Sequence, residues 1–270
     1  MPILIICRKE ASTLKRHCRK KVLIVGEANL LAGRARTLHL FPLTSNELTD
    51  LDLLKYCRYG GLPLIYLSDD PWRDLKEYVH LYLKEELNYQ KVANDAGVPP
   101  RTVANFVEVL KDTLLAFELE PYLKTKKRKA ISKSKIFLFD VGVANYLAGR
   151  KEILFRSESF GKAFEHFIIQ EIRAYLDYHQ VDEKLSYWRT VSGTFEVDCI
   201  IGDQIAIEIK AAENFQNKMI SGLVELKKEK KIKNFFLISR DPVSRVIDGI
   251  QVVHYEQFLK SLWESQLFSR

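Results

Sequence analysis

The sequence contains few cysteines and no long apolar run, and both absences narrow the class of protein. The four cysteines in 270 residues lie far apart and form no C-x-x-C pair, so we expect reduced thiols, no disulfide and no zinc site. No stretch approaches the ~20 apolar residues that a membrane span needs. The start, Met1–Cys7, has no basic residue before its short apolar run and fails as a signal peptide. These features predict a cytoplasmic protein without a membrane segment.

A phosphate-binding loop is also missing. No G-x-x-x-x-G-K-[ST] motif occurs, and the pair Gly161-Lys162 is followed by alanine at the start of a predicted helix. We therefore expect no ATP binding by this chain alone. Hydrophobic residues make up 47% of the chain, and the formal net charge is +7. The first value predicts a globular core, and the second fits either an acidic partner such as nucleic acid or simple solubility.

The chain divides into three predicted regions, and the fold class expected is mixed α/β. Residues 1–48 contain short strands with basic connectors, residues 49–150 are mainly helical, and residues 151–270 form a further α/β region. In the first region, Ile3–Ile6 and Val22–Val25 suit buried parallel strands.

The middle region carries an apolar stripe and then a helix-turn-helix pattern. The stripe predicts a helix over Trp72–Leu87. Its expected core side chains are Leu75, Val79, Tyr82 and Leu83. Two short helices are expected between Asn88 and Leu115. Gly97 permits the turn between them, and Pro100 suits the first turn of the second helix, where a missing N–H costs nothing.

A basic segment follows the second helix and leads into an apolar strand at Ile136–Phe139. Helix, helix and basic hairpin together predict a winged helix. Its candidate DNA-binding residues are Arg101, Lys124, Lys126, Lys127, Arg128, Lys129 and Lys133. Such side chains would neutralise phosphates. The segment fits equally well as a solvated hairpin tip, and winged helices also serve as packing modules that touch no nucleic acid.

Two alternating strands, Glu196–Ile201 and Ile205–Lys210, are joined by a three-residue turn that contains Gly202. That turn fixes the register of the hairpin. One face carries three apolar pairs, Ile201–Ile205, Cys199–Ile207 and Val197–Ile209. The other face carries two polar pairs, Asp198–Glu208 and Glu196–Lys210.

The opposed carboxylates of Asp198 and Glu208 predict a metal site. Cross-strand partners lie about 4.5–5.5 Å apart, so two like charges there are unfavourable unless a cation lies between them. Mg²⁺ (or Mn²⁺) prefers carboxylate oxygens, and we predict these two residues as its ligands. If the site cleaves a phosphodiester, Lys210 would orient the attacking water or offset negative charge on the phosphate. The alternatives are the wet face of a plain hairpin and a surface salt bridge between Glu196 and Lys210.

An amphipathic helix is predicted over Glu158–Tyr178. Its apolar arc consists of Phe164, Ile168, Ile169, Ile172, Tyr175 and Leu176. The opposite, polar side consists of His166, Gln170, Arg173 and Asp177. Glu165 falls inside the apolar arc, where a lone carboxylate costs several kcal/mol unless it is paired, metal-bound or protonated. We therefore interpret Glu165 as a second, independent indication of a functional site.

The set Glu165 and Asp198-x9-Glu208-x-Lys210 resembles the PD-(D/E)XK nuclease superfamily. The resemblance implies a restriction-endonuclease-like α/β fold for residues 151–270. It also implies that Asp198 and Glu208 bind Mg²⁺ or Mn²⁺, that Lys210 is the catalytic lysine and that Glu165 is an auxiliary acid. DNA is then the expected partner.

More of the chain resembles prokaryotic AAA-type ATPases that end in the domain of unknown function 4143, a winged helix followed by a nuclease-like fold. The resemblance rests on Leu31-Ala-Gly-Arg-Ala-Arg, Leu40-Phe-Pro-Leu-Thr, Tyr59-Gly-Gly-Leu-Pro, Ala93-Asn-Asp-Ala-Gly-Val and Phe137-Leu-Phe-Asp-Val-Gly-Val-Ala-Asn.

That resemblance implies an ATPase core ahead of Leu40, and here the sequence departs from the family because the nucleotide-binding half is missing. Residues 1–48 look like the remnant of such a core, with Ile3–Ile6 as its sensor strand and Arg34 near a neighbour's nucleotide. The run Phe137–Asp140 imitates a Walker B strand but lies where the family has its wing.

Three functions follow as hypotheses. The leading one is a Mg²⁺-dependent DNA-processing enzyme with a nuclease-like site. The second is a non-catalytic DNA-binding or assembly module whose salt-sensitive binding needs no metal. The third is an ATPase-family protein that needs a partner to supply the phosphate loop. A homo-oligomer or an ATPase partner fits the last two.

Overall fold

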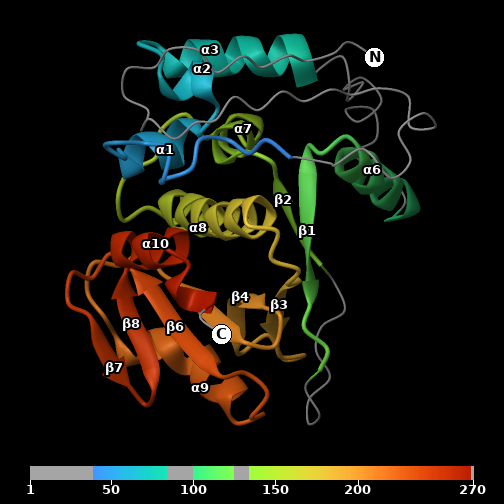
Figure 1. Ribbon diagram of the computed structural model, residues 1–270. Coiled ribbons are helices and arrows are strands. Elements are labelled where there is room, and N and C mark those ends of the chain that lie inside the picture. The colour runs from blue at the N-terminus through green and yellow to red at the C-terminus, as the bar shows by residue number, and fades with distance from the viewer. Residues whose placement is uncertain (1–38, 84–99, 125–133, 269–270) are drawn as a thin grey trace.

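The computed structural model describes residues 39–83, 100–124 and 134–268 (Figure 1). In these parts of the chain eight strands form one mixed sheet in the order β2-β1-β3-β4-β5-β6-β8-β7. The strands are β1 (Ala116–Pro121), β2 (Lys135–Leu138), β3 (Leu185–Arg189), β4 (Glu196–Ile201), β5 (Ile205–Ile209), β6 (Asn234–Ser239), β7 (Arg245–Ile247) and β8 (Ile250–His254). The chain is a mixed α/β protein, as the sequence predicts.

The α-helices of the described residues are α1 (Leu53–Tyr59), α2 (Pro63–Tyr66), α3 (Pro71–Tyr78), α6 (Pro100–Asp112), α7 (Val141–Leu147), α8 (Glu158–Tyr178), α9 (Ser221–Lys227) and α10 (Tyr255–Trp263). A π-helical turn η2 (Val79–Leu83) and two 3₁₀ turns, η3 (Asn217–Ile220) and η4 (Gln266–Phe268), complete the set. In the view of Figure 1, α8 lies above the strands β3–β8, α1 and α7 lie above α8, and α2 and α3 lie at the top. None of the helices in the described ranges is long and apolar enough to cross a membrane.

Helix α8 is the central helix and has the bounds that its apolar arc predicts. It begins after Ser157, whose Oγ accepts the N–H of Phe160 at 3.0 Å and so caps the helix. α8 lies between α1 and α7 on one side and the sheet on the other (Figure 1). Its apolar arc therefore enters a core cluster shared with β4, β5, β6 and α10.

The opposite side of α8 is not the polar surface that periodicity predicts. His166 and Gln170 are only 5% and 3% exposed. The β1–β2 hairpin covers His166: the rings of Phe117 and Phe137 lie 6.3 and 5.3 Å from its imidazole, and Leu138 O lies 2.8 Å from His166 Nε2. Burial lowers the pKa of His166 to about 4, so the ring is neutral at pH 7. The apolar stripe of a helix predicts which side faces the core, but it cannot predict that another part of the chain packs on the opposite side.

The β4–β5 hairpin has the predicted three-residue turn, and its register is confirmed for two pairs, Cys199 with Ile207 and Ile201 with Ile205. The sheet also runs across the region boundary expected near residue 150. β1 pairs in parallel with β3 through Glu120 opposite Ser186. The boundaries near residues 48 and 150 stay predictions.

Hydrogen bonds between the chain segments around Gly60 and Asp140 hold α1 and α7 together. Asp140 is fully buried, and its carboxylate accepts the backbone N–H groups of Gly61 and Gly142, each at 2.8 Å. Asn145 Nδ2 donates to Cys57 O at 2.7 Å and satisfies a carbonyl in the last turn of α1. A carboxylate engaged in this way serves packing, so the Walker B likeness of this strand is superficial.

The apolar stripe predicted over Trp72–Leu87 is partly wrong. Leu75 and Val79 are buried as expected, but Tyr82 is 60% exposed. The reason is that α3 ends at Tyr78 and continues as a π-helical turn, which has more residues per turn than an α-helix and so changes the direction of the side chains that follow.

Pro100 begins α6, as the helix-turn-helix pattern predicts for the second helix. The first helix of that pattern lies outside the described residues, as do Ile3–Ile6, Val22–Val25 and Arg34. The winged helix as a whole stays a prediction.

Candidate functional site

A β-bulge shapes the acidic face of the hairpin. Ser186 on β3 pairs with Ile200, but Trp188 pairs with Val197, so one residue of β3 lies opposite both Asp198 and Cys199. Such a bulge re-aims a side chain. The amide N–H of Ile209 donates to Asp198 Oδ2 at 2.9 Å and fixes the carboxylate.

Because of the bulge, the apolar face of the β4–β5 hairpin differs from the face that the sequence predicts. Val197 was predicted to lie beside Cys199 and Ile201, but it packs with Ile200 and Ala206 on the α9 side of the sheet, whereas Cys199 packs on the α8 side. Two residues opposite one interrupt the strict alternation on which the prediction depended.

Lys210 joins the two acids that were predicted as metal ligands. Its Nζ lies 2.5 Å from Glu208 Oε1 and 3.7 Å from Asp198 Oδ2. The predicted pairing of Lys210 with Glu196 is wrong, because Glu196 contacts Lys135 and Arg189 instead. Asp198, Glu208 and Lys210 are therefore brought together as the motif requires, and the surface salt bridge considered for this lysine is not formed.

Lys135, the first residue of β2, is the member of the cluster that sequence reasoning missed. Its Nζ lies 3.1 Å from Glu165 Oε1, 2.5 Å from Glu196 Oε1 and 3.6 Å from Asp198 Oδ1. Glu165, placed by α8 at the edge of the cluster, is thus paired rather than isolated. The lysine belonged to the basic segment in the sequence, and only the sheet order β2-β1-β3-β4 brings it here.

An excess of acids governs the electrostatics of this cluster, in which four carboxylates face Lys135, Lys210 and the more exposed Arg189. Burial and the charge of Asp198 raise the pKa of Glu208 well above its usual range, and the same two causes raise the pKa of Glu165. Burial alone would lower the pKa of Lys210, but the nearby acids outweigh it and raise that pKa. The acids around Lys135 likewise outweigh its burial and raise its pKa, so Lys135 and Lys210 are both charged at neutral pH.

The oxygens of the cluster are unequally satisfied. Glu208 Oε2 is buried and accepts no hydrogen bond from any described residue. Both oxygens of Asp198, in contrast, face a lysine. Within the described ranges, no three or more His, Cys, Asp or Glu side chains are grouped so that they could hold a metal ion; in this cluster the acids converge on lysine nitrogens instead.

The candidate DNA-binding residues are only partly described. Lys124 is exposed and forms an ion pair with Asp203 at 2.7 Å. Arg101 lies in α6, but its side chain is outside the described part of the structure. The remaining residues of this set lie in the undescribed range 125–133.

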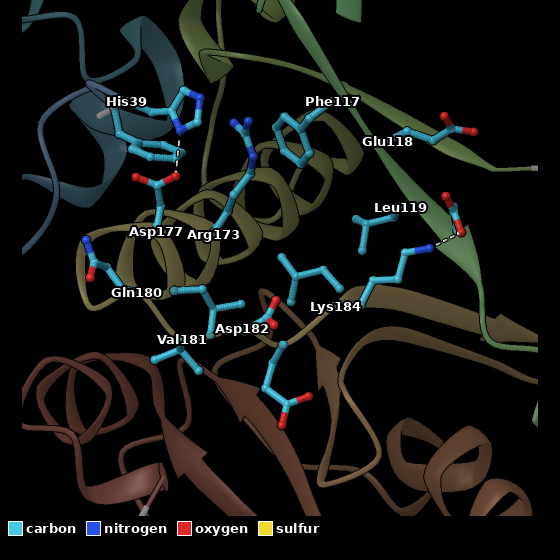
Figure 2. Close-up of a pocket in the computed structure, with 15 residues that line it drawn as sticks. His39, Phe117, Glu118, Leu119, Arg173, Asp177, Gln180, Val181, Asp182 and Lys184 are labelled. Carbon is cyan, nitrogen blue, oxygen red and sulfur yellow. Dashed lines mark hydrogen bonds and ion pairs between the residues drawn. The ribbon is translucent and has the colours of Figure 1, made fainter. Parts of the chain in front are cut away.

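A separate hollow of about 530 Å³ lies between residues 39–41, β1 and the end of α8 (Figure 2). Arg173 crosses it, with its guanidinium 4.4 Å from the Phe117 ring and 4.9 Å from the Phe41 ring. Asp177 faces His39, whose Nδ1 lies 2.6 Å from Asp177 Oδ2 (Figure 2). The stacking and this pair attach the segment before α1 to α8, and the acids of this hollow do not converge on one point.

The fold and the cluster together define a mixed α/β protein with a site of acids and lysines in which Asp198 and Glu208 are buried. Two parts of the chain match family models. Residues 160–258 match the family described as "Domain of unknown function (DUF4143)", so this domain is present. Residues 73–153 match "Domain of unknown function (DUF8612)".

Two curated relatives are the uncharacterized protein Rv2008c of Mycobacterium tuberculosis and the uncharacterized protein Mb2031c of Mycobacterium bovis. Each is 23% identical over 235 residues, which cover 73% of this chain and 52% of the relative. The chain thus spans about half the length of the curated relatives it matches. No solved structure matches it.

Proposed function

We propose that the acidic cluster is the divalent-metal site of a DNA phosphodiesterase of the PD-(D/E)XK type. The observation that carries the proposal is the buried Oε2 of Glu208, which accepts no hydrogen bond from any described residue although it lies beside Asp198. A buried acceptor without a donor costs about 1–3 kcal/mol, and the neighbouring like charge adds to that cost. A bound cation would remove both penalties.

The residues present fit a hard cation. Asp198 and Glu208 would hold Mg²⁺ or Mn²⁺, because such ions take one or two protein carboxylates and complete their shell with water and phosphate oxygens. When bound, the ion would polarise the scissile phosphate and lower the pKa of a water molecule.

The remaining roles belong to side chains of the chain itself. Lys210 is 38% exposed at its side chain and holds Glu208, so its ammonium can reach a substrate phosphate and offset developing negative charge. Glu165 is the auxiliary acid, and burial and the charge of Asp198 raise its pKa, which favours proton uptake by this group.

DNA is the proposed substrate because helix α6 is followed directly by the antiparallel β1–β2 hairpin, the arrangement of a winged helix. The hairpin borders the acidic cluster through Lys135. A duplex held by the described strands of this hairpin would therefore lie near the proposed cleavage site.

Incubation of plasmid or branched DNA with the protein and Mg²⁺ or Mn²⁺ tests the proposal. We expect cleavage, and a loss of at least about a hundredfold in rate in the Asp198→Asn, Glu208→Gln and Lys210→Met variants. Glu120→Gln is the matched control, because Glu120 is an acid of the same sheet paired with Lys184. Equal cleavage by the control and the three site variants, or metal-free DNA binding without cleavage, would leave the non-catalytic module as the better description.

A further inference from the structure

Lys135 is a charged group of the acidic cluster to which the proposed reaction gives no role. Three carboxylate oxygens, from Glu165, Glu196 and Asp198, lie within 3.6 Å of its Nζ. These acids belong to α8 and β4, whereas Lys135 enters from the β1–β2 hairpin. Its side chain is 24% exposed and lies over the Tyr187 ring at 5.3 Å.

The position of this ammonium is that of a cation among its ligands. A lysine ammonium has three donors and no acceptor, and here three acids surround it. One of them, Asp198, is a proposed metal ligand, and its two oxygens are divided between Lys135 and Lys210. A divalent ion bound at Asp198 would therefore lie within a few ångströms of a second positive charge.

We infer that Lys135 is an internal competitor of the divalent ion, so that the first residue of β2 regulates metal access to the acidic cluster. This inference rests on the proposed function. Lys135 in place offsets part of the negative charge of Asp198, Glu165 and Glu196 without a metal. When Lys135 moves away, Asp198 becomes free to bind the ion. The position of the β1–β2 hairpin, which carries Lys135, therefore determines whether the acids contact Lys135 or the metal ion.

A purely structural role predicts the opposite response to mutation. If Lys135 only ties β2 to β4 and α8, its removal loosens the acids and leaves metal affinity unchanged or weaker. If it competes, its removal leaves an uncompensated acidic site that binds the ion more tightly. The sign of the change in affinity separates the two roles.

Calorimetric titration of the full chain with Mn²⁺ measures that sign. We expect Lys135→Met to bind Mn²⁺ at least about tenfold more tightly than the wild type, because a like charge has been removed. Lys135→Arg should stay near the wild-type affinity, since it keeps the charge. Lys111→Met is the matched control: Lys111 pairs with Glu108 and with Glu118 of the same hairpin, outside the cluster, and its loss should not change the affinity.

A second measurement needs no variant and remains informative if Lys135→Met does not fold. Because coupling is reciprocal, saturating Mn²⁺ should speed hydrogen exchange in the wild type at Phe137 and Phe139, whose N–H groups face β1. Unchanged or weaker Mn²⁺ affinity in a folded Lys135→Met, or slower exchange in β2 with Mn²⁺, overturns the inference and leaves the proposed function intact. Absence of Mn²⁺ binding in every variant overturns both.

Discussion

At the scale of single residues, Glu208 is where function and stability oppose each other. Its carboxylate is buried, lies beside Asp198 and has one oxygen without a described partner. A site prepared for a cation should be destabilising while the cation is absent, and acids gathered for function commonly reduce stability in this way.

The prediction is that Glu208→Gln stabilises the protein in the presence of EDTA by about 0.5–2 kcal/mol, because a neutral amide removes a charge that the cluster disfavours. Lys210→Met should instead destabilise it, since that change leaves Glu208 and Asp198 without their shared ammonium. Urea unfolding followed by circular dichroism measures both. Destabilisation by both variants would show that the acidic cluster is not strained.

Glu171 is a second buried carboxylate with a testable charge. It accepts hydrogen bonds from Ser45 N and Ser45 Oγ, each at 2.7 Å, and from Trp263 Nε1 at 2.8 Å. Burial outweighs these bonds and raises the pKa of Glu171 to about 7. The folded state therefore binds this proton more tightly than the unfolded chain, whose carboxyl titrates near pH 4.3.

The sign of the pH dependence follows from that shift. Glu171 contributes its full stabilisation below about pH 4.3, and the contribution is lost as pH rises towards 7. Relative to Glu171→Gln, the wild type should lose on the order of 3 kcal/mol between these pH values. Unfolding free energies of the two proteins from pH 4 to pH 8 give the difference. A constant difference would mean that folding does not raise the pKa of Glu171.

At the scale of secondary-structure elements, local patterns predict what local forces determine. The bounds of α8 and the turn of the β4–β5 hairpin follow from apolar spacing and from Gly202. The bulge at Asp198 does not, because it depends on how β3 pairs with β4. The π-helical turn after Tyr78 likewise leaves no signal in the apolar stripe.

Helix α9 provides a prediction at this scale. A methyl group added at Gly222 would lie 1.9 Å from Glu196 O, in the strand that carries the acidic face, whereas one added at Gly161 in α8 meets no atom within 4 Å. Gly222→Ala should therefore push α9 off β4 and destabilise the protein by about 1–3 kcal/mol. Gly161→Ala should stabilise it by about 0.5–1 kcal/mol, since alanine is the better helix former.

Thermal unfolding of the two alanine variants checks the pair. The matched substitution in α8 controls for the helix-propensity gain that both share. Equal stability of the two variants would mean that α9 can shift away from β4 at no cost.

At the scale of the whole molecule, the order of the strands is what the sequence could not predict. The hairpin β1–β2 is expected from the basic segment, but its place beside β3 comes from a short parallel pairing. That pairing brings Lys135 to Glu165, 30 residues away in the chain, and so creates half of the contacts in the acidic cluster. Motif spacing predicted which acids meet, and only the sheet revealed the lysine between them.

The described parts of the chain also share one core across residue 150, and this leads to a prediction about cooperativity. Tyr56 in α1 is fully buried; its hydroxyl donates to Leu43 O at 2.6 Å, and its ring lies 4.8 Å from that of Phe167 in α8. Tyr56→Phe leaves the Leu43 carbonyl without this donor, at a cost of about 1–3 kcal/mol.

If one cooperative unit includes α1 and the acidic hairpin, that cost should lower hydrogen-exchange protection in β4 and β5 by as much as it lowers the free energy of unfolding. Hydrogen exchange read by mass spectrometry compares the wild type with Tyr56→Phe. Leu64→Ala is the control, because Leu64 is 85% exposed and its loss should change neither quantity. Protection lost around α1 alone, with β4 and β5 unchanged, would indicate two independent units and favour the predicted boundary near residue 150. Loss in both regions would mean that a change in the helical layer reaches the acidic cluster through the shared core.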